Sequence, residues 1–519
     1  MSSDQIYHEL FINIDNKEAQ KRLLIEAIEL GLEFKIARDN PYPVLNYKNQ
    51  EEIINSILEE IPDEGVDIGQ VIKELKQNVI DGSLNFSSPY FFSFPDCGNS
   101  LSGVLGDLFS GMLNQNLISS YTSPTATFIE IVVINWLRKI AGFPVAKKPK
   151  SIHEVGGVSI TGGVSANTIG LLLARENHFP GTMQTGLTYN PANICVFLPR
   201  GIGHYSIKAA LGWLGLGEQS AVEVEITPDF CIDQNDLLDK ITVARKHGNI
   251  PLLLVAYAGD SRTMSVDDFP SLAEIAKKNN MWFHVDACHG FSLLFSKQMR
   301  YLVQGIELAD SVTIDPHKVL FIPYTSSFLL IKNPSKFSLI SGISDLITRE
   351  KYSFGQMTPF FGSRNFSSLK IWFLIKSIGC KGIGRLIDER HEKVKYFSKK
   401  IDHVKDVYRM NNVIINSCTF LYVPQNWKEV LRQYGSGNIM KCINDLNTAI
   451  HKRIIYEGKF HIHLFPIHDF KNIMKTGVNT VFHVHRIMIG NPLTTQKIID
   501  EFIAYFCLVS VDEYRKLSL

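Results

Sequence analysis

Short continuous apolar runs alternate with amphipathic stretches through the middle of the chain, and this pattern restricts the possible folds most strongly. The runs fall at residues 157–161, 194–198, 252–256, 281–285, 311–314 and 326–331. Strands that are apolar on both faces and separated by helices are typical of a mostly parallel sheet covered on both sides. We therefore expect an α/β fold whose ligands bind beyond the carboxyl ends of the strands.

The sequence on either side of this region has a different texture. Apolar positions at helical spacing predict a helical segment within residues 1–90. The sheet pattern places a large domain at residues 91–385. Short alternating runs at 417–422 and 482–489 then predict a smaller α+β domain over residues 386–519.

Composition and charge exclude several classes of protein. Lys and Arg total 53 and Asp and Glu total 52, so the net charge of +1 gives no electrostatic basis for binding nucleic acid or an anionic membrane. None of the eight cysteines forms a CxxC pair, and no apolar run is long enough to cross a bilayer. The first residues also lack the basic and apolar regions of a secretory signal. We expect a cytoplasmic enzyme.

A glycine turn follows the first apolar run. Gly162 and Gly163 precede a helical pattern whose apolar face includes Ile169 and Leu172. A helix N-terminus after such a turn presents backbone N–H groups and a positive dipole end, which suits a phosphate, and the Ser165 hydroxyl would add a bond. The GK[ST] ending of a P-loop is missing. A plain strand-to-helix turn has the same sequence pattern.

Three polar residues follow other apolar runs. Asp286 comes directly after one run, Lys318 follows the next, and His204 follows the run at 194–198. A lysine inside a crowded site can lose its proton and attack a carbonyl group. Taken singly, each residue has an ordinary explanation: a helix-capping aspartate, a surface lysine and a structural histidine.

Together these residues match the needs of one cofactor, pyridoxal 5′-phosphate. Its phosphate suits helix amides, its aldehyde forms a Schiff base with a lysine, and its ring nitrogen stays protonated beside a carboxylate. A histidine such as His204 can stack on its ring. The joint occurrence of these residues therefore predicts a site for pyridoxal phosphate.

The chain resembles the group II pyridoxal-phosphate-dependent amino acid decarboxylases over residues 88–492. The motifs that carry the resemblance are Ser-Pro-Tyr-Phe-Phe (88–92), Thr-Ser-Pro-Thr-Ala-Thr-Phe-Ile-Glu (122–130), Gly-Gly (162–163), His-Tyr-Ser-Ile-Lys-Ala-Ala (204–210), His-Val-Asp-Ala (284–287), Ala-Asp-Ser-Val-Thr-Ile-Asp-Pro-His-Lys (309–318), Ser-Leu-Lys-Ile-Trp-Phe (368–373) and Arg-Ile-Met-Ile-Gly-Asn-Pro (486–492). The resemblance implies a type I fold with a mostly parallel seven-stranded sheet. It also implies a homodimer whose N-terminal helices pack on the partner subunit.

The resemblance assigns roles to the residues singled out above. Lys318 would form the Schiff base, Asp286 would pair with the ring nitrogen, and His204 would stack on the ring. Val164 and Ser165 would hold the phosphate, mainly through backbone amides.

Further residues of the cofactor site follow from the same resemblance. Ala287 would lie against the ring beside the aspartate, and His317 would lie near the phosphate. Ser261 keeps a hydroxyl in the segment that usually reads Ala-Gly-Thr-Thr in the family. Asp260, in the same segment, departs from that pattern and is expected to alter the surroundings of the cofactor.

The mobile loop after the lysine bears on the outcome of the reaction. In the family, a tyrosine on this loop protonates the product, and Tyr352 is the one tyrosine in residues 337–363. A phenylalanine in its place, for which Phe354 is the candidate, goes with oxidative deamination to an aldehyde in related enzymes. We expect decarboxylation of an L-amino acid to an amine, with Tyr352 as the acid.

Two groups of alternatives stay open. An oxidative aldehyde synthase or a carbon–carbon lyase would use the same cofactor, and Cys288 occurs in the equivalent motif of sphingosine-phosphate lyases. The second alternative is a catalytically silent paralogue with a structural role. The presence of Lys318, Asp286 and His204 argues against it.

Aromatic residues near the start of the large domain indicate the substrate class. Tyr90, Phe92 and Phe94 favour an apolar or aromatic side chain, and the segment lacks the polar residues of glutamate enzymes. Arg364 and Arg486 match family arginines near the carboxyl-binding and C-terminal regions, although either also fits a structural role.

A group of histidines near the C-terminus resembles a metal site. The histidines are His461, His463, His468, His483 and His485. A His-x-His pair in a strand places both rings on one face, but a functional zinc site needs three or four convergent ligands. The family that this chain resembles uses no metal, so we expect no metal site here.

Overall fold

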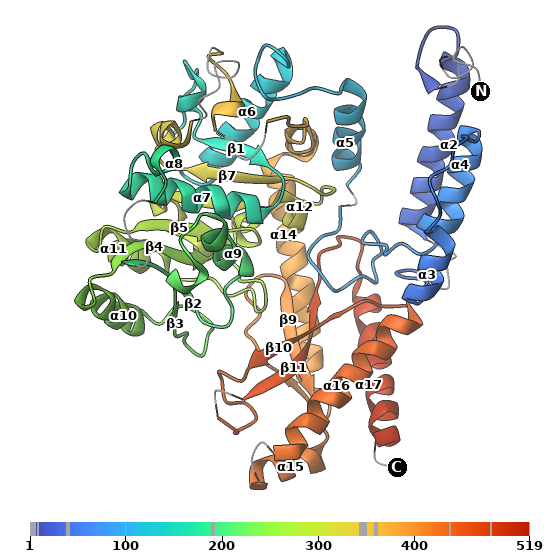
Figure 1. Cartoon of the computed structure of the whole chain (residues 1–519). Coiled ribbons are helices and arrows are strands. Elements are labelled where there is room, and N and C mark those ends of the chain that lie inside the picture. The colour runs from blue at the N-terminus through green and yellow to red at the C-terminus, as the bar shows by residue number, and fades with distance from the viewer. Residues whose placement is uncertain are drawn as a thin grey trace.

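The computed structural model describes residues 7, 10–37, 42–98, 100–187, 193–341, 350–357, 362–434, 437–477 and 480–517. Its strands form a seven-stranded sheet in a large domain and a four-stranded sheet in a small domain, and a column of N-terminal helices stands beside both (Figure 1).

The large sheet has the strand order β1-β7-β6-β5-β4-β2-β3. Its strands are β1 (Gly157–Ile160), β2 (Ile194–Pro199), β3 (Ala221–Val224), β4 (Ile250–Tyr257), β5 (Trp282–Asp286), β6 (Ser311–Ile314) and β7 (Ser327–Ile331). The strand β7 runs antiparallel to both of its neighbours, and the other pairs are parallel. The prediction of a mostly parallel seven-stranded sheet is therefore confirmed.

Burial explains why the central strands are apolar throughout. Every residue of β5 and β6 is buried, and so is β4 after its first residue. The helix α7 (Gly163–His178) crosses this sheet and contacts β4 to β7, and it is buried continuously from Ala166 to Glu176. Burial of this much apolar surface is the main driving force for the fold.

The remaining helices of the large domain surround the sheet. They are α5 (Leu101–Leu113), α6 (Pro124–Ile140), α7 (Gly163–His178), α8 (Thr182–Thr185), α9 (Tyr205–Trp213), α10 (Gln234–Lys246), α11 (Phe269–Lys278) and α12 (Pro316–Val319). Because each parallel crossover returns to the same end of the sheet, the loops after β1, β2, β4, β5 and β6 gather at one edge.

The small domain is built on an antiparallel sheet with the order β10-β11-β9-β8. Its elements are β8 (Val407–Arg409), β9 (Ser417–Tyr422), α15 (Gln425–Tyr434), α16 (Gly437–Glu457), β10 (His463–His468), β11 (Val481–Met488) and α17 (Gln496–Leu517). A cluster of rings fills its core, in which Phe460, Phe502 and Phe506 contact one another or Phe420. The arrangement is the α+β type predicted from the alternating runs.

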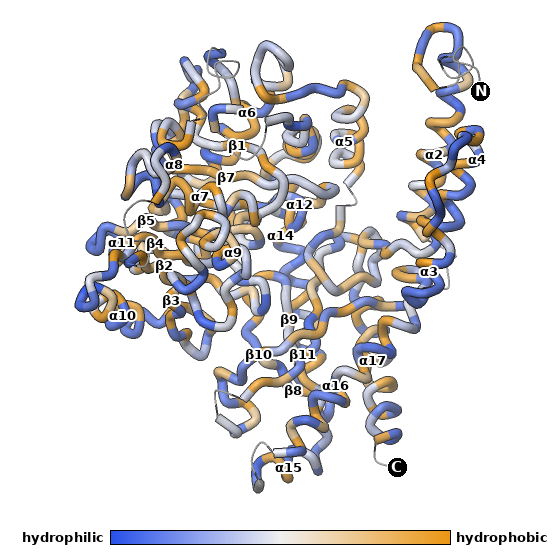
Figure 2. Tube along the Cα trace, viewed as in Figure 1, coloured by the Kyte–Doolittle hydropathy of each residue, from blue (hydrophilic) through white to orange (hydrophobic). Residues whose placement is uncertain are grey.

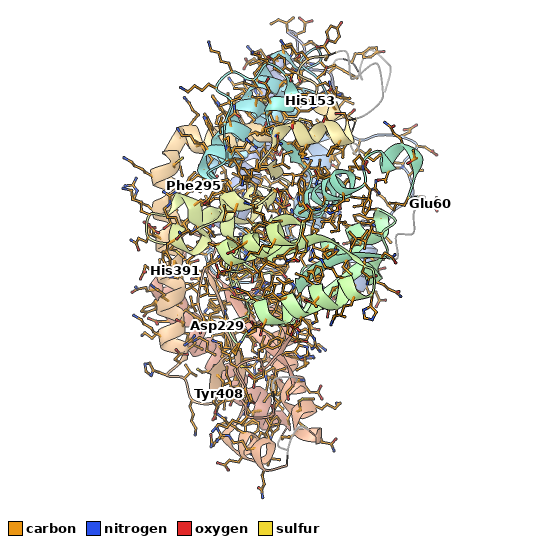
Figure 3. The ribbon with its side chains drawn as sticks, turned by 90° about the vertical axis from the view of Figure 1, so that its left-hand side faces the viewer. Glu60, His153, Asp229, Phe295, His391 and Tyr408 are labelled. Carbon is orange, nitrogen blue, oxygen red and sulfur yellow. The ribbon has the colours of Figure 1, made fainter. Side chains whose placement is uncertain are left out.

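One helix connects the two cores. The helix α14 (Ser368–Ile401) has a non-helical residue, Gly379, within it. Ile371 and Ile387 belong to the core of the large domain, whereas Val394 and Phe397 belong to the core of the small domain. Figure 3 shows this helix along one side of the molecule, with His391 on it and Tyr408 in the small domain below.

The N-terminal helices form an arm beside the rest of the chain, with apolar residues recurring along it (Figures 1 and 2). Many of the apolar side chains of this arm are exposed. The arm consists of α2 (Lys17–Ile36), α3 (Gln50–Ile57), α4 (Ile68–Glu74) and the π-helical segment η1 (Leu75–Ile80). The helix α3 starts with a capping box, in which Asn49 and Glu52 bond each other's backbone N–H groups. Within the described residues, no helix is long and apolar enough to span a membrane.

Candidate active site

A cavity of about 180 Å³ opens at the edge where the parallel strands end. It lies between the carboxyl ends of β4, β5 and β6 and the N-terminus of α7. The residues that line it are Gly163, Val164, Asn167, His204, Tyr205, Tyr257, Gly259, Ser261, Asp286, Cys288, His289, Asp315, His317 and Lys318. The cavity therefore contains Lys318, Asp286 and His204, which are far apart in the sequence.

Lys318 enters the cavity from the short helix α12. Its Nζ lies 2.8 Å from Asp315 Oδ2, and Asp315 is 1% exposed and also accepts a hydrogen bond from Ser327. Burial is the largest single influence and disfavours the ammonium, but the charge and hydrogen bond of Asp315, together with Cys288 and Asp286, outweigh it and raise the pKa of Lys318 above its ordinary value. Burial is also the largest single influence on Asp315, but the charges of Lys318 and His317 and the hydrogen bonds from Lys318 and Ser327 together lower the pKa of Asp315.

Asp286 ends strand β5 as a buried carboxylate with two donors. Asn167 Nδ2 donates to Asp286 Oδ2 at 2.9 Å, and the backbone N–H of Cys288 donates to Oδ1 at 3.1 Å. Such bonds satisfy a buried carboxylate and fix its orientation. The carboxylate is thereby held at the rim of the sheet.

The N-terminus of α7 forms another wall of the cavity. Gly162 precedes the helix with φ +84° and no side-chain cap. A Cβ on Gly163 would lie 2.8 Å from both Asp315 and Cys288, so only glycine fits there. The first turn therefore presents backbone N–H groups and its positive dipole end toward the cavity beside Val164.

His204 is the N-cap residue of α9. Its Nδ1 accepts a bond from the backbone N–H of Ser206 at 3.3 Å and lies 2.7 Å from Ser206 Oγ. Burial lowers the pKa of His204, although the charge of Asp286 opposes this effect. The imidazole is therefore neutral near neutral pH.

The neighbouring cavity residues are fixed by the backbone around them. His317 Nδ1 lies 2.7 Å from the carbonyl oxygen of Ser326, and its ring packs on Tyr324. The carbonyl oxygen of Ser261 accepts a hydrogen bond from Arg486. Tyr257 ends strand β4, and its hydroxyl accepts a bond from the backbone N–H of His204 at 2.9 Å.

Asp260 organises a turn. Its carboxylate accepts bonds from the backbone N–H groups of Arg262, Thr263 and Ser265 at 2.7, 2.8 and 2.9 Å. It is fully buried and does not line the cavity. The departure from the family pattern at this position is therefore satisfied within the turn.

Three of the predicted site residues do not line the cavity. Ser165 donates to the carbonyl of Thr161 at 3.1 Å, and Ala287 is buried in the turn after β5. Tyr352 lies elsewhere, because its hydroxyl donates to the Pro149 carbonyl at 2.8 Å and its ring packs on Phe128. The structure thus places Tyr352, the predicted acid, outside this cavity. Part of the loop before it, residues 342–349, is outside the described residues.

The two predicted arginines have different surroundings. Arg364 forms an ion pair with the fully buried Glu130 at 2.5 Å and also bonds two backbone carbonyls. Arg486 is 3% exposed and contacts the carbonyls of Ser261 and Ser93 together with His463, all of them neutral groups. No carboxylate in the described part of the chain forms an ion pair with Arg486. Its burial lowers its pKa to about 10.

The aromatic residues at 90–94 face different parts of the molecule. Phe92 is buried in the core of the small domain, and Tyr90 packs against Phe460 of the same core. Phe94 instead packs on His463, the neighbour of Arg486. Tyr90 and Phe92 therefore stabilise the small domain, and the argument for an apolar or aromatic substrate rests on Phe94 alone among the three rings.

The C-terminal histidines do not converge. His485 is fully buried beside Phe420 and Phe506, and His483 Nδ1 lies 3.2 Å from Thr448. His463 accepts a bond from Arg486 at 3.0 Å. Among the residues that the structure describes, no group of three or more ligand side chains has the arrangement of a metal site.

Several cavity residues were not predicted from the sequence. Asp315 stands three residues before Lys318 and Tyr257 ends a strand, so both follow the rule that located Lys318 and Asp286. Asn167 lies one helical turn after Gly163 on the same face of α7. Position at a strand end or on the first turn of this helix was the usable signal.

A model of a protein family matches most of the chain. Its description is "Pyridoxal-dependent decarboxylase conserved domain", and it matches residues 51–423. This range includes the whole large domain and the residues that line the cavity.

Individual proteins match over most of their length. The chain is 29% identical to an aspartate 1-decarboxylase of Aliivibrio fischeri, over 85% of this chain and 83% of the relative. It is 25% identical to an aromatic-L-amino-acid decarboxylase of Bacillus atrophaeus, over 80% and 82%. The crystal structure of mouse CSAD in apo form matches with a TM-score of 0.84 and 23% identity, covering 95% of this chain and 99% of that one.

Proposed function

The chain belongs to the pyridoxal-dependent decarboxylase family, and on this premise we propose that it removes the α-carboxylate of an L-amino acid as CO₂ at the cavity around Lys318. The family makes the protein a carboxy-lyase with pyridoxal 5′-phosphate as cofactor. The observation that carries the proposal is the meeting of Lys318, Asp286 and His204 in one cavity at the strand ends.

The residues of the cavity fit this cofactor. The uncapped N-terminus of α7 offers amides of Val164 and its neighbours to a phosphate, with Ser165 in the same turn, and Gly163 leaves the space that a Cβ would fill. Lys318 would be the covalent attachment point. When bound, the cofactor supplies an electron sink for the pair of electrons that CO₂ leaves behind.

The other residues of the chain would orient the ring and hold its charge. Asp286, fixed by Asn167 and the Cys288 amide, would keep the ring nitrogen protonated. The neutral His204 would stack on the ring, with Ser261 beside the cavity and His317 near the phosphate. The Lys318 amine attacks only after it gives up its proton, and in the free protein the carboxylate of Asp315 stabilises the protonated form by accepting a hydrogen bond from the ammonium.

Arg486 is proposed to bind the carboxylate of the substrate. It is a buried cation without an ion-pair partner in the described part of the chain. The carboxylates of Asp260 and Asp96 favour its charge from farther away, but burial still lowers its pKa, so an anion in direct contact would stabilise it further. Its contact with Ser261 places it beside the cavity. Phe94 and His463 flank it, so we propose a substrate side chain that packs against aromatic rings.

The first experiment tests Lys318 directly. Lys318→Arg keeps a cation beside Asp315 but has no attachment point, and Lys318→Ala removes both. We expect both variants to lose the visible absorption of the bound cofactor and the release of CO₂ from a panel of aromatic and acidic L-amino acids, while their circular dichroism stays that of the wild type. Normal turnover in either variant would contradict the proposal.

The same assay separates the alternatives. Equal amounts of CO₂ and amine identify a decarboxylase, and an aldehyde with peroxide identifies the oxidative enzyme. Cleavage without CO₂ identifies a carbon–carbon lyase, for which Cys288 in the cavity wall is the structural argument. Failure to bind pyridoxal phosphate at all identifies a silent paralogue.

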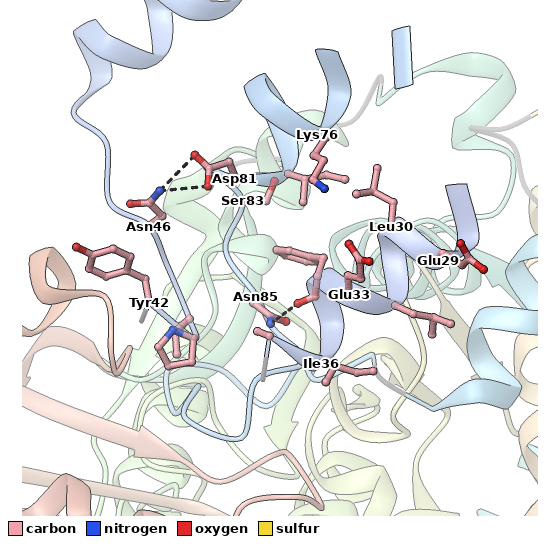
Figure 4. A pocket seen from close by; sticks show the side chains of 16 residues that line it. Glu29, Leu30, Glu33, Ile36, Tyr42, Asn46, Lys76, Asp81, Ser83 and Asn85 are labelled. Carbon is pink, nitrogen blue, oxygen red and sulfur yellow. Dashed lines mark hydrogen bonds between the residues drawn. The ribbon is translucent and has the colours of Figure 1, made fainter. Parts of the chain in front are cut away.

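We further propose that the protein is a homodimer assembled through the N-terminal arm. On α2 the side chains of Leu24, Ile25, Ile28 and Leu32 are each at least 40% exposed. Between α2 and η1 lies a groove of about 720 Å³, lined by both apolar and charged residues (Figure 4). Exposed apolar surface of this extent is typical of a protein–protein interface, and a second copy would cover it.

Sedimentation measurements test this assembly. We expect the wild type to sediment at about twice the mass of one chain, 58.6 kDa. Leu32→Asp should shift the protein to the monomer, whereas Leu238→Asp, at a similarly exposed leucine on α10, should not.

We also propose that the chain divides into an N-terminal segment at residues 1–90, a large domain at 91–385 and a small domain at 386–519. The helix α14 crosses the second boundary.

A further inference from the structure

A chain of buried hydrogen bonds runs beneath the cavity from Trp282 to Asp286. Trp282 Nε1 lies 2.8 Å from Ser311 Oγ, which lies 2.7 Å from His284 Nδ1. His284 Nε2 lies 3.1 Å from Asn167 Oδ1, and Asn167 Nδ2 lies 2.9 Å from Asp286 Oδ2. All of these side chains are buried, so each bond is protected from competition with water.

The donor and the acceptor of each hydrogen bond in this series follow from its two ends, Asp286 and Trp282. Asp286 is a carboxylate and only accepts, so the amide nitrogen of Asn167 faces it and the amide oxygen faces His284. His284 Nε2 must then carry a proton. Burial lowers the pKa of His284 to about 4, so the ring is neutral and Nδ1 accepts from Ser311. Ser311 in turn accepts from Trp282, whose indole N–H can only donate.

A second branch leaves Asn167 toward His204. The other N–H of Asn167 Nδ2 donates to Ser206 Oγ at 2.9 Å. Ser206 Oγ is 2.7 Å from His204 Nδ1, and the backbone N–H of Ser206 also donates to that nitrogen at 3.3 Å. A nitrogen that accepts from a backbone N–H carries no proton, so the Ser206 hydroxyl donates to it as well.

We propose that Asn167 and Ser206 are positioning residues that hold His204 in the tautomer with its proton on Nε2, and that Asn167 couples this tautomer to the orientation of Asp286. His204 Nε2 makes no hydrogen bond to the residues that the structure describes, and His204 lines the cavity. Its N–H is therefore available to an acceptor there, such as an anionic oxygen of a bound ligand.

This tautomer limits what His204 can do. A neutral imidazole with its proton on Nε2 donates a hydrogen bond into the cavity and cannot take a proton through that nitrogen. His204 is thus set as a donor and not as a general base. The significance for catalysis rests on the proposed function, but the tautomer itself does not.

Nitrogen NMR of the full-length protein tests the inference without turnover. The probe is magic-angle-spinning NMR of protein labelled with ¹⁵N-histidine, at pH 8, before and after addition of pyridoxal phosphate, with His204 assigned by its loss in His204→Gln. We expect a protonated Nε2 and a bare Nδ1 for His204 in both states. A protonated Nδ1, or a mixture of the two forms in the wild type, would overturn the inference.

Matched serine variants test whether the Ser206 hydroxyl holds the tautomer of His204. Ser206→Ala removes the hydroxyl donor to Nδ1 but keeps the backbone N–H of residue 206, so the fraction of the Nδ1-protonated form should rise without becoming complete, and Ser206→Thr, which keeps the hydroxyl, should restore the wild-type spectrum. Ser311→Ala makes the same chemical change at the far end and should alter the signals of His284 but not those of His204. If Ser206→Ala leaves the His204 spectrum unchanged, the hydroxyl does not hold the tautomer. A lack of decarboxylase activity in the wild type would affect none of these readings.

Discussion

Lys318 Nζ lies 2.8 Å from the buried carboxylate of Asp315, three residues before it in the chain. This ion pair stabilises the form of the lysine that cannot react. The ammonium form of Lys318 is stabilised by the neighbouring charge, whereas attack on a carbonyl requires the free amine. Asp315 therefore controls how easily the lysine can react.

Replacing Asp315 by Asn should make Lys318 more reactive at lower pH. Loss of the negative charge lowers the pKa of Lys318, so a larger fraction of the amine is unprotonated at any given pH. We expect the pH midpoint at which the cofactor-free protein captures pyridoxal phosphate to fall by about one pH unit or more. The visible absorption of the bound cofactor measures this midpoint. Ser327→Ala, which removes a partner of Asp315 but keeps its charge, is the control. An unchanged midpoint in Asp315→Asn would show that the pair does not control the lysine.

Substitution of Arg486 should affect substrate binding, whereas substitution of Arg364 should affect stability. Arg486→Gln removes a charged hydrogen-bond donor beside the cavity, so we expect the KM for the amino acid to rise about 10- to 100-fold. Arg364→Gln leaves the carboxylate of Glu130 buried without its cation, which should lower the free energy of unfolding by about 3–5 kcal/mol. Steady-state kinetics and urea unfolding on both variants separate the two effects. A normal KM in Arg486→Gln would remove this residue from the substrate site.

Tyr352→Phe tests whether the loop tyrosine takes part in the reaction. The hydroxyl is bonded to the Pro149 carbonyl, and its loss should lower the free energy of unfolding by about 1 kcal/mol. We expect the rate of amine formation to stay within about threefold of the wild type, a change of well under 1.4 kcal/mol in the barrier. The assay measures amine, CO₂ and peroxide together. A switch from amine to aldehyde and peroxide would instead give Tyr352 the role of the acid.

Acid should destabilise the protein through His284. Its pKa is about 4 in the folded protein because of burial, against an ordinary value near 6.5. Between these values the unfolded chain binds a proton that the folded chain does not, so stability falls as the pH drops from 6.5 toward 4. The contribution of this one residue is about 3 kcal/mol at roughly 1.4 kcal/mol per pH unit. Urea unfolding at pH 7 and pH 5 should show a smaller pH effect in His284→Gln; an equal effect would contradict the assignment.

The strands of the large sheet were largely predictable because burial on both faces makes them uniformly apolar. The predicted run at 311–314 coincides with β6, and those at 252–256 and 281–285 fall within two residues of β4 and β5 at either end. The edge strand β3 was missed because it is short and only partly buried. The antiparallel direction of β7 depends on packing against β1 and β6, which no local pattern encodes.

The residues of the site also differ in how far the sequence predicts their positions. Lys318, Asp286 and His204 each follow a strand, so their common position at the sheet edge could be predicted. Neighbours in sequence were a poorer guide in irregular segments. Phe92 and Phe94 are two residues apart, yet one is buried in the core of the small domain and the other packs beside Arg486. Asn167 was missed because its importance depends on partners in two other elements, β5 and α9.

The helix α14 supplies apolar side chains to the cores of both domains. Loss of either core would strip half of this helix of its packing, so unfolding of one domain removes part of the free energy that holds the other. The two domains should therefore melt in a single cooperative transition. A shorter version that ends at residue 385 would cut the helix between its two sets of contacts, and the catalytic domain should not persist without its smaller neighbour.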